Sequence, residues 1–385
     1  MTEQYDVVVM GGGIIGSSIA FHLSLRGVGN IAVVEKDPSY EFAATPRSNG
    51  GIRRLFSRPQ NIEMASYGLE FYRSFSEQLG IDADISFRRQ GYMFVSDDGG
   101  HAQMEENFTL QNSMGVEVEV LEPSALRDRF PSIVTDNVTM AVLSDHDAWI
   151  DPYAALMGFR AAASKNGVSF IHGEIRGLEI ESGAVHHAIL ADGRNLAAET
   201  FVNACGAWCA SVADMAGVKL PVQPMSRESY FFKTAKALEA LPFVKTETDL
   251  AIRPEGNGYV GGLPNWAEKD GWNFDVSDEY FMNQVWPALA SLIPPMEELK
   301  LERIWRGHYA RSQFDLSPYL GAASNGPENF LLANGFSGHG IMHAPATGRA
   351  LAELIVDGRF ESVDLGCFSY ERLLRCEPYR ELGIV

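Results

Sequence analysis

The sequence of 385 residues is poor in cysteine, has far fewer basic than acidic residues, and lacks long hydrophobic runs. No stretch approaches the roughly 20 uninterrupted apolar residues of a membrane-spanning helix, so no integral membrane segment is expected. Lysine and arginine together number 31 against 50 aspartates and glutamates, which gives a formal net charge of -19. Because nucleic acids and anionic membranes bind basic surfaces, neither is expected as a partner.

The cysteines Cys205, Cys209, Cys367 and Cys376 have the spacing of neither a zinc site nor a redox pair. We therefore expect four free thiols in a reducing compartment, and no metal site. The first apolar strand starts at Tyr5, which leaves no room for the charged, apolar and cleavage regions of a secretory signal. This pattern predicts a cytoplasmic protein.

The length suffices for two to three domains of about 150 residues. Residues 1–85, 145–220 and 320–385 alternate expected strands with expected helices and would together form one α/β domain. Residues 86–144 and 221–319 carry short alternating strand-like runs close to turn signals. These two segments would form an inserted, antiparallel-sheet domain that covers the first.

A glycine-rich turn directly follows the first expected strand, in the segment VVVMGGGIIGSSIAFHLSLRG. Its residues Gly11, Gly13 and Gly16 form a GxGxxG pattern at the start of a helix. Gly11 allows the tight turn, Gly13 lets the backbone approach a pyrophosphate, and Gly16 lets the helix lie close to the strand. Glu35 closes the second strand, 19 residues after Gly16, where an acid binds ribose hydroxyls. The segment predicts a Rossmann-like dinucleotide-binding domain.

A second GxGxxG match at Gly256, Gly258 and Gly261 has neither a strand before it nor a helix after it, and predicts a hairpin instead. One fingerprint in the right context indicates one bound dinucleotide. Near the end of the chain, the segment ANGFSGHGIMHAPATG lies between an expected strand, 330–333, and an expected helix, 346–356.

Five segments, taken together and in this order, resemble the D-amino-acid oxidase family of flavoproteins. They are the GxGxxG turn with its acid, ATPRSNGGIRRLFS, FVNACGAWC, RPEGNGYVGG and GFSGHG. The resemblance covers nearly the whole chain and is closest to the branch of glycine and sarcosine oxidases and FAD-dependent oxidoreductase-domain proteins. It implies FAD as the cofactor, bound by a Rossmann-like domain, and an inserted antiparallel domain for the substrate.

Hydroxyl and N–H groups of Ser48 and the turn after it can face the pyrophosphate and the flavin edge, with Arg47 as a charge partner. The turn at 338–341 offers N–H donors and a helix dipole to negative charge on a reduced flavin. His339 either contacts the flavin or only fixes this turn. The expected cofactor-binding residues are Gly11, Gly13, Ile14, Ile15, Gly16, Glu35, Lys36, Arg47, Ser48, Gly50, Gly51, Ile52, Ile175, Ala204, Gly206, Trp208, Gly307, Gly335, Ser337, Gly338, His339, Gly340 and Ile341.

The resemblance further implies oxidation of the C–N bond of an amino acid or N-substituted amino acid, with hydride transfer to flavin N5 and release of an imine. Arg53 is expected to hold the substrate's carboxylate, while Arg54 faces solvent or exchanges roles with it. Each expected site residue could instead be a surface arginine or a packed aromatic residue. The expected catalytic set is Arg53, Arg227, Tyr309, His308 and His339.

Three positions depart from the sarcosine oxidases. Gly307 replaces the cysteine that tethers their flavin, so FAD is expected to bind non-covalently. Tyr259 and Met342 replace two lysines, one that activates oxygen and one that contacts substrate. The electron acceptor is thus left open between oxygen and a quinone or other carrier. Two other functions also stay open: a FAD-dependent 2-hydroxy-acid dehydrogenase, and a non-catalytic flavoprotein assembly factor.

Overall fold

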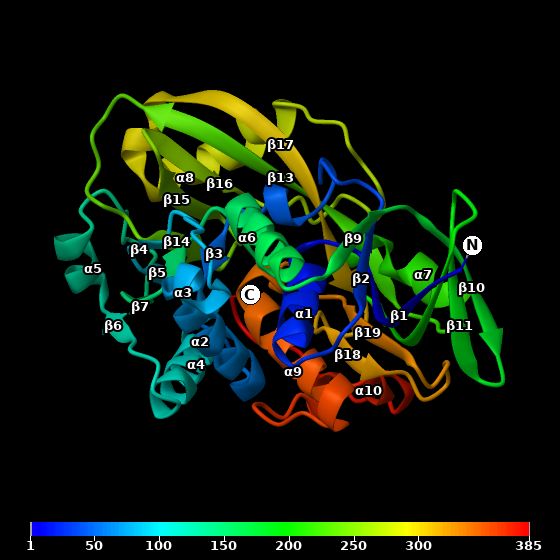
Figure 1. Cartoon of the computed structure of the whole chain (residues 1–385). Coiled ribbons are helices and arrows are strands. Elements are labelled where there is room, and N and C mark those ends of the chain that lie inside the picture. Colours follow the sequence, from blue (N-terminus) through cyan, green and yellow to red (C-terminus); the bar gives the residue numbers. More distant parts are fainter. Residues whose placement is uncertain (1, 385) are drawn as a thin grey trace.

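The computed structural model describes residues 2–384, which form two eight-stranded β-sheets and a small three-stranded sheet (Figure 1). The central five strands of the first sheet are mutually parallel, and its other three strands pair antiparallel. The first sheet consists of β10 (Ile175–Glu181), β11 (Ala184–Leu190), β12 (Asn195–Asn203), β1 (Thr2–Met10), β2 (Ile31–Glu35) and β9 (Ser169–His172) in that order. In addition, β19 (Phe330–Asn334) pairs with the second half of β12, and β18 (Tyr319–Ala322) pairs with β19.

The second sheet is antiparallel except at one strand pair and arches over the first (Figure 1). Its strands, in order, are β17 (Leu299–Ser312), β13 (Val222–Thr234), β16 (Gly258–Gly262), β15 (Ala251–Glu255), β14 (Phe243–Thr246), β5 (Tyr92–Ser96), β7 (Met140–Ser144) and β6 (Glu119–Leu121). The third sheet joins β3 (Gly51–Ile52), β8 (Ala148–Trp149) and β4 (Arg88–Arg89).

Two features of the second sheet bear on the sequence predictions. The second GxGxxG match lies in the antiparallel hairpin β15–β16, as predicted, but the expectation that no strand precedes it is wrong, because β15 ends at Glu255, directly before Gly256. The expectation of short strands is wrong at β13 and β17, which have 13 and 14 residues and pair along their whole length. Charged residues interrupt the apolar alternation of both strands, and Arg306 of β17 pairs with Glu228 of β13. This ion pair stabilises the pairing of the two strands at positions where the sequence shows no apolar alternation.

Helices pack on both faces of the first sheet. On β1, Val7 and Val9 face the core under α1, α2, α6 and α9, whereas Val8 and Met10 face the core under α7, as strand alternation requires. The helices are α1 (Ile14–Leu25), α2 (Pro59–Arg73), α3 (Phe75–Leu79), α4 (His101–Ser113), α5 (Pro123–Arg129), α6 (Pro152–Lys165), α7 (Cys209–Met215), α8 (Trp286–Leu292), α9 (Gly340–Asp357) and α10 (Glu371–Leu374).

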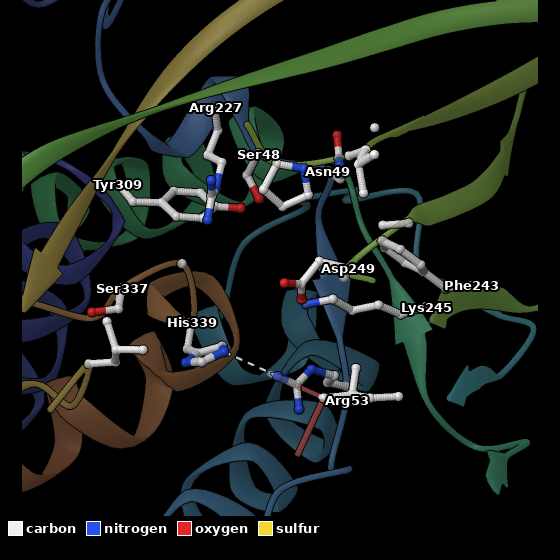
Figure 2. Close-up of a pocket in the computed structure, with 18 of the residues that line it drawn as sticks. Ser48, Asn49, Arg53, Arg227, Phe243, Lys245, Asp249, Tyr309, Ser337 and His339 are labelled. Carbon is white, nitrogen blue, oxygen red and sulfur yellow. Dashed lines mark hydrogen bonds and ion pairs between the residues drawn. The ribbon is translucent and has the colours of Figure 1, made fainter. Parts of the chain in front are cut away.

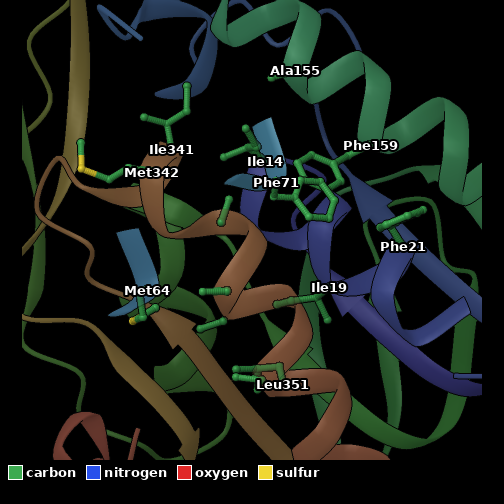
Figure 3. Packing of buried hydrophobic residues seen from close by; sticks show 14 of the residues in the cluster. Ile14, Ile19, Phe21, Met64, Phe71, Ala155, Phe159, Ile341, Met342 and Leu351 are labelled. Atoms are coloured by element: carbon green, nitrogen blue, oxygen red, sulfur yellow. The ribbon is translucent and has the colours of Figure 1, made fainter. Parts of the chain in front are cut away.

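Aromatic rings fix the positions of α1, α2 and α6 relative to one another (Figure 3). Phe71 of α2 stacks on Phe159 of α6 with a centroid separation of 5.5 Å, and Phe21 of α1 lies 5.9 Å from Phe159. These contacts bury large apolar areas and favour one geometry. The N-terminus of α1, where the nucleotide is expected, is therefore held by a rigid core.

Helix α9 begins at Gly340, six residues earlier than the sequence predicted, and it contains Pro345. A proline inside a helix leaves the carbonyl four residues earlier without its usual N–H donor. Here that carbonyl belongs to Ile341, and it accepts a hydrogen bond of 2.7 Å from the hydroxyl of Tyr72. The side chain from α2 thus replaces the missing donor and allows the helix to start at the glycine-rich turn.

Across residues 2–384, no helix combines the length and apolar character needed to cross a bilayer. In the same residues, no cluster of three or more His, Cys, Asp or Glu side chains is arranged to hold a metal ion. All four cysteines are free, as predicted.

Candidate active site

Two adjoining cavities lie where residues of the first and second sheets meet. The first, of about 610 Å³, begins at the GxGxxG turn, and we call it the nucleotide cleft. The second, of about 690 Å³, is lined by Arg53, Arg227 and Lys245, and we call it the arginine cavity (Figure 2). The lining residues that the two share are Ser48, Tyr309, Ser337, Gly338 and Ile341. A molecule that fills the cleft therefore ends at the arginine cavity.

Glycines at the start of α1 shape the nucleotide cleft. Gly11 has a φ of +99°, and an added Cβ would lie 2.4 Å from the carbonyl oxygen of Ala204. A Cβ on Gly16 would lie 1.9 Å from the carbonyl oxygen of Gly11, so strand and helix approach closely there. Gly13 caps α1 without a side-chain hydrogen bond, and an added Cβ would meet only the Thr45 hydroxyl, at 3.9 Å. The open space beside the helix N-terminus fits a bound pyrophosphate.

Glu35 lines the nucleotide cleft at the end of β2. One carboxylate oxygen accepts the N–H of Gly12 at 2.8 Å, and the other accepts the N–H of Asp37 at 2.8 Å. Burial raises the pKa of Glu35. Each oxygen keeps a second lone pair, which suits hydrogen bonds from ribose hydroxyls. Lys36 lies over the ring of Trp208, with its Nζ 3.6 Å from the ring centroid.

Most of the expected cofactor-binding residues line the nucleotide cleft, although they come from distant parts of the chain. These are Gly11, Gly13, Ile14, Ile15, Glu35, Lys36, Ser48, Ile175, Ala204, Gly206, Trp208, Ser337, Gly338, Gly340 and Ile341. Three others, Gly50, Gly51 and His339, line the arginine cavity instead. The remaining five, Gly16, Arg47, Ile52, Gly307 and Gly335, line neither cavity.

The structure explains where Arg47 and Gly307 lie. The guanidinium of Arg47 donates hydrogen bonds to the carbonyl oxygens of Glu41, at 2.6 Å, and Arg306, at 2.8 Å. A Cβ on Gly307 would lie 3.0 Å from the Cβ of Arg47. Arg47 therefore packs against β17 and ties the loop after β2 to it, and its pairing with the pyrophosphate stays a prediction.

Glycines and an aromatic ring form the junction of the two cavities. Gly338 has a φ of +103°, and an added Cβ would lie 2.8 Å from the ring of Tyr309. Gly340 and Ile341 begin α9 and line the nucleotide cleft. The first N–H groups of a helix have no acceptor within the helix and carry its positive dipole end. The start of α9 can thus stabilise negative charge at this junction.

Arg53 lines the arginine cavity and is only 3% exposed. Its guanidinium donates to the carbonyl oxygen of Leu55 and lies over the ring of Phe56, 4.1 Å from the centroid. Its Nη2 also donates to Nε2 of His339 at 3.1 Å (Figure 2). Among the described residues, no carboxylate lies within salt-bridge distance of Arg53. Burial lowers the pKa of this guanidinium, and an anion bound beside it would offset the cost of the buried charge.

His339 holds Arg53 and does not line the nucleotide cleft. Arginine has only donors, so the Nε2 of His339 must be the unprotonated acceptor and its Nδ1 carries the proton. Burial and the charge of Arg53 hold the pKa of His339 well below its usual range. The neutral ring packs edge-on against Phe56, with a centroid separation of 5.2 Å, so its contacts position the arginine.

Arg54 points away from the arginine cavity, but it does not face solvent. Its Nε donates to Asp147 at 2.8 Å, and its backbone N–H donates to the same carboxylate at 2.9 Å. Asp147 is fully buried and Arg54 is only 9% exposed. The uncertainty between the two neighbouring arginines is resolved by these contacts, because Arg54 forms a structural ion pair and Arg53 lines the cavity.

Arg227 and Tyr309 line the arginine cavity from the neighbouring strands β13 and β17. The guanidinium carbon of Arg227 lies 4.4 Å from the ring centroid of Trp266 and 5.5 Å from that of Tyr309. The Nη1 atom of Arg227 is buried and has no hydrogen-bond partner among residues 2–384. By contrast His308 lines only the nucleotide cleft, where its Nε2 accepts the N–H of Asn273 at 3.2 Å. His308 therefore lies outside the arginine cavity.

Sequence reasoning missed Lys245 and Asp249, which form an ion pair of 3.1 Å in the arginine cavity. Burial, together with the charges of Arg53 and Arg227, lowers the pKa of Lys245 to about 8. No motif surrounds this pair; its sole signal was a lysine and an aspartate four residues apart after an apolar strand. The hairpin lacks a lysine, but the arginine cavity contains one, so the electron acceptor stays open between oxygen and a quinone or other carrier.

Comparison with known proteins identifies the family. Residues 6–354 match the DAO family, described as FAD dependent oxidoreductase. The chain is 36% identical to FAD-dependent oxidoreductase domain-containing protein 1 of Xenopus laevis, over 100% of this chain and 85% of that protein.

Two solved structures share the fold. L-proline dehydrogenase from P. horikoshii has a TM-score of 0.88 and 27% identity, covering 98% of this chain and 100% of its own. Glycine oxidase from Geobacillus kaustophilus has a TM-score of 0.82 and 23% identity, covering 95% and 98%.

The chain therefore belongs to the DAO family of FAD-dependent oxidoreductases and has the mixed α/β fold of its FAD-dependent amino acid oxidases. It is an FAD-dependent oxidoreductase, similar to amino acid oxidases and dehydrogenases. The nucleotide cleft has a glycine turn, a helix N-terminus and an acid at the end of β2, features that suit a bound FAD.

Proposed function

We propose that this protein oxidises the C–N bond of an amino acid or an N-substituted amino acid in the arginine cavity. The observation that carries the proposal is the buried Arg53, which has no carboxylate partner in the described chain and lies in the cavity that meets the nucleotide cleft. A planar guanidinium binds a carboxylate through two parallel hydrogen bonds. L-proline dehydrogenase, whose fold this chain shares at 27% identity, is named for an amino acid whose amine is secondary.

The chain's own residues would bind and orient the substrate. Arg53, held by His339 and Phe56, would fix the carboxylate, and Asp249 would accept a hydrogen bond from the amine. Tyr309 and Met342 would cover the reacting carbon and exclude water. When FAD is bound, it supplies the acceptor for the hydride that leaves the α-carbon. The imine so formed would hydrolyse after release.

The proposal is tested by mixing the yellow holoenzyme, without oxygen, with amino acids, N-alkyl amino acids and the matching 2-hydroxy acids. Loss of the yellow colour with an amino acid, and not with its hydroxy analogue, is the expected result. Reduction by the hydroxy acid alone would overturn the proposal in favour of C–O bond oxidation. Reoxidation of the reduced enzyme by oxygen and by a quinone, followed separately, identifies the electron acceptor.

We also propose that FAD is bound without a covalent bond. Of the four cysteines, Cys205 alone lines either cavity; its thiol donates to the carbonyl oxygen of Met10 at 3.1 Å, and burial raises its pKa to about 12. A thiol in this state is a poor nucleophile. Acid precipitation should therefore release all the yellow colour into the supernatant. A yellow pellet would contradict this prediction. The peptide that carries the flavin, isolated after proteolysis, would then identify the attached residue.

A further inference from the structure

The charges in the arginine cavity do not balance. Among the charged lining residues, Lys245 is paired with Asp249, while Glu228 pairs with Arg306 and Arg311 with Asp270, two partners outside the lining. Glu247 also lines the cavity and accepts a hydrogen bond from Ser96, and Arg380 lines it at a solvent-exposed position. In the described chain, neither Arg53 nor Arg227 has a carboxylate within salt-bridge distance. Two guanidinium groups are thus left without an anion. Because an uncompensated charge is costly away from water, the cavity is suited to a ligand that brings two negative groups.

The two arginines lie on different walls of the cavity. Arg53 follows β3 and its guanidinium points toward His339 in the lower part of Figure 2, whereas Arg227 descends from β13 beside Tyr309. In the same view, Lys245 and Asp249 lie between them. A single carboxylate bound to Arg53 would leave the buried Nη1 of Arg227 without a partner.

We propose that the substrate is a dicarboxylic amino acid or N-substituted amino acid, with one carboxylate on Arg53 and the second on Arg227. The proposal rests on the proposed function and names its substrate class. A monocarboxylic amino acid has one carboxylate and one ammonium group, so its net charge is zero. Its carboxylate can pair with Arg53 or with Arg227, but not with both. A dicarboxylic amino acid has one net negative charge, and its amine would face Asp249. The cavity of about 690 Å³ also accepts molecules much larger than glycine.

The test compares each dicarboxylic substrate with an analogue in which the distal carboxylate is a carboxamide. Glutamate and glutamine, aspartate and asparagine, and N-(carboxymethyl)glycine and N-(carbamoylmethyl)glycine are the pairs, with both enantiomers where they exist. We expect kcat/KM for anaerobic flavin reduction to be at least about 30-fold higher for the acid of the productive pair. Equal or faster reduction by the amide would overturn the dicarboxylate proposal and leave the proposed function intact.

Two variants locate the second anchor. Arg227→Met should remove the preference for the acid, with kcat/KM falling far more on the acid than on the amide, while Arg227→Lys should retain part of the preference. Arg380→Met is the matched control, because Arg380 also lines the cavity but its side chain is exposed to solvent. It should keep the preference of the wild type. A preference that survives in Arg227→Met would overturn the assignment of Arg227.

Binding separates this inference from the proposed function. Glutarate cannot be oxidised at a C–N bond, and its monoamide differs from it only at one carboxylate. We expect glutarate to raise the melting temperature of the holoenzyme more than the monoamide does, and this difference should vanish in Arg227→Met. If no amino acid reduces the flavin, the proposed function fails, yet this difference would still support two anion sites. Equal effects of both ligands would overturn them.

Discussion

Arg53 and Arg54 are neighbours in the sequence but have opposite roles in the structure. Arg54 forms an ion pair with the fully buried Asp147, whereas Arg53 rests on Phe56 and His339 with no anion beside it. Removing one member of a buried ion pair leaves the other charge without a partner. In the part of the chain that the structure describes, Arg53 has no carboxylate partner, so its removal leaves no buried charge unpaired. The two arginines can therefore be distinguished by parallel measurements of stability and activity.

Arg53→Met should keep a normal flavin spectrum and a near-normal free energy of unfolding, but lose most of its activity. Loss of a buried charge-assisted pair costs about 2–5 kcal/mol, or roughly 30-fold to several thousand-fold in kcat/KM. The loss should be much smaller on the matching amine that has no carboxyl group. Equal losses on both substrates would show that Arg53 is structural.

Arg54→Met is the matched comparison, and it should mainly reduce stability. Asp147 would remain buried without its cation, which costs about 3–5 kcal/mol of the free energy of unfolding. Urea unfolding of both variants, followed by tryptophan fluorescence, measures this difference. A stable Arg54→Met with low activity would reverse the assignment of the two residues.

At the residue scale, the sequence revealed sites that depend on local backbone chemistry. Gly11, Gly16 and Glu35 could be predicted because a tight turn, a close approach and a strand end lie within one short segment. Lys245 could not, because it enters the cavity only through the pairing of β14 with β5, about 150 residues earlier in the chain. The contact of Arg47 with the carbonyl oxygen of Arg306 could not be predicted either, because the two residues are 259 positions apart in the chain.

Helix α9 is the element that joins the core to the site. Its start lines the junction of the two cavities, and its middle packs closely on α1, where the hydroxyl of Ser18 donates to the carbonyl oxygen of Ala344 at 2.8 Å. Sequence reasoning placed the start too late because Pro345 normally marks a boundary. The hydrogen bond from Tyr72 that permits the earlier start joins two elements far apart in the sequence.

Gly348 is where α9 approaches α1 most closely, and Gly348→Ala should destabilise the fold. The added Cβ would lie 2.3 Å from the hydroxyl of Ser18 and 2.7 Å from the Nδ1 of His22. Overpacking of this kind costs about 1–3 kcal/mol, which exceeds the gain of about 1 kcal/mol from alanine in a helix. Chemical unfolding measures the loss. Gly177→Ala on β10 is the control, since its Cβ would lie at an ordinary contact distance of 3.7 Å from Ile189. A Gly348→Ala variant as stable as this control would show that α1 and α9 can move apart at no cost in stability.

Across the whole molecule, the nucleotide cleft and the arginine cavity are assembled from segments that span the chain. The first sheet takes strands from both ends and the middle, and the second takes its strands from the two stretches between them. Alternation of strand and helix patterns is a local signal, so the sequence could indicate two kinds of segment, and the domain boundaries drawn from them stay a prediction. The length of β13 and β17, and the cavity beneath them, depend on pairing that no local pattern encodes.

Two buried histidines, His22 of α1 and His343 of α9, tie the stability of the whole molecule to pH. Burial lowers the pKa of His22 to about 4 and that of His343 to about 3. The Nδ1 of His22 lies 2.8 Å from the carbonyl oxygen of Ser18, so it carries the proton and donates it. Both rings are therefore neutral in the folded protein, while histidines of the unfolded chain protonate near pH 6.5.

The sign of the pH effect follows from this difference in pKa. As pH falls from about 6.5 toward 4, the unfolded chain gains protons that folded His22 does not accept, so stability is lost over this range. Between pH 7 and pH 5 the contribution of His22 is a loss of about 2 kcal/mol. The charges that face His22 are Arg349, which lowers its pKa, and Glu353, which raises it.

His22→Asn should weaken this dependence on pH, because asparagine keeps a donor near the position of Nδ1 but does not titrate. We expect the variant to be less stable than the wild type at pH 7, since the smaller side chain leaves space beside the aromatic rings of α2 and α6. Its loss of stability between pH 7 and pH 5, measured by urea unfolding in excess FAD, should nevertheless be smaller by about 2 kcal/mol. His186→Asn, at an exposed position on β11, should retain the slope of the wild type. If His22→Asn also retained that slope, His22 would not be the group that couples folding to pH.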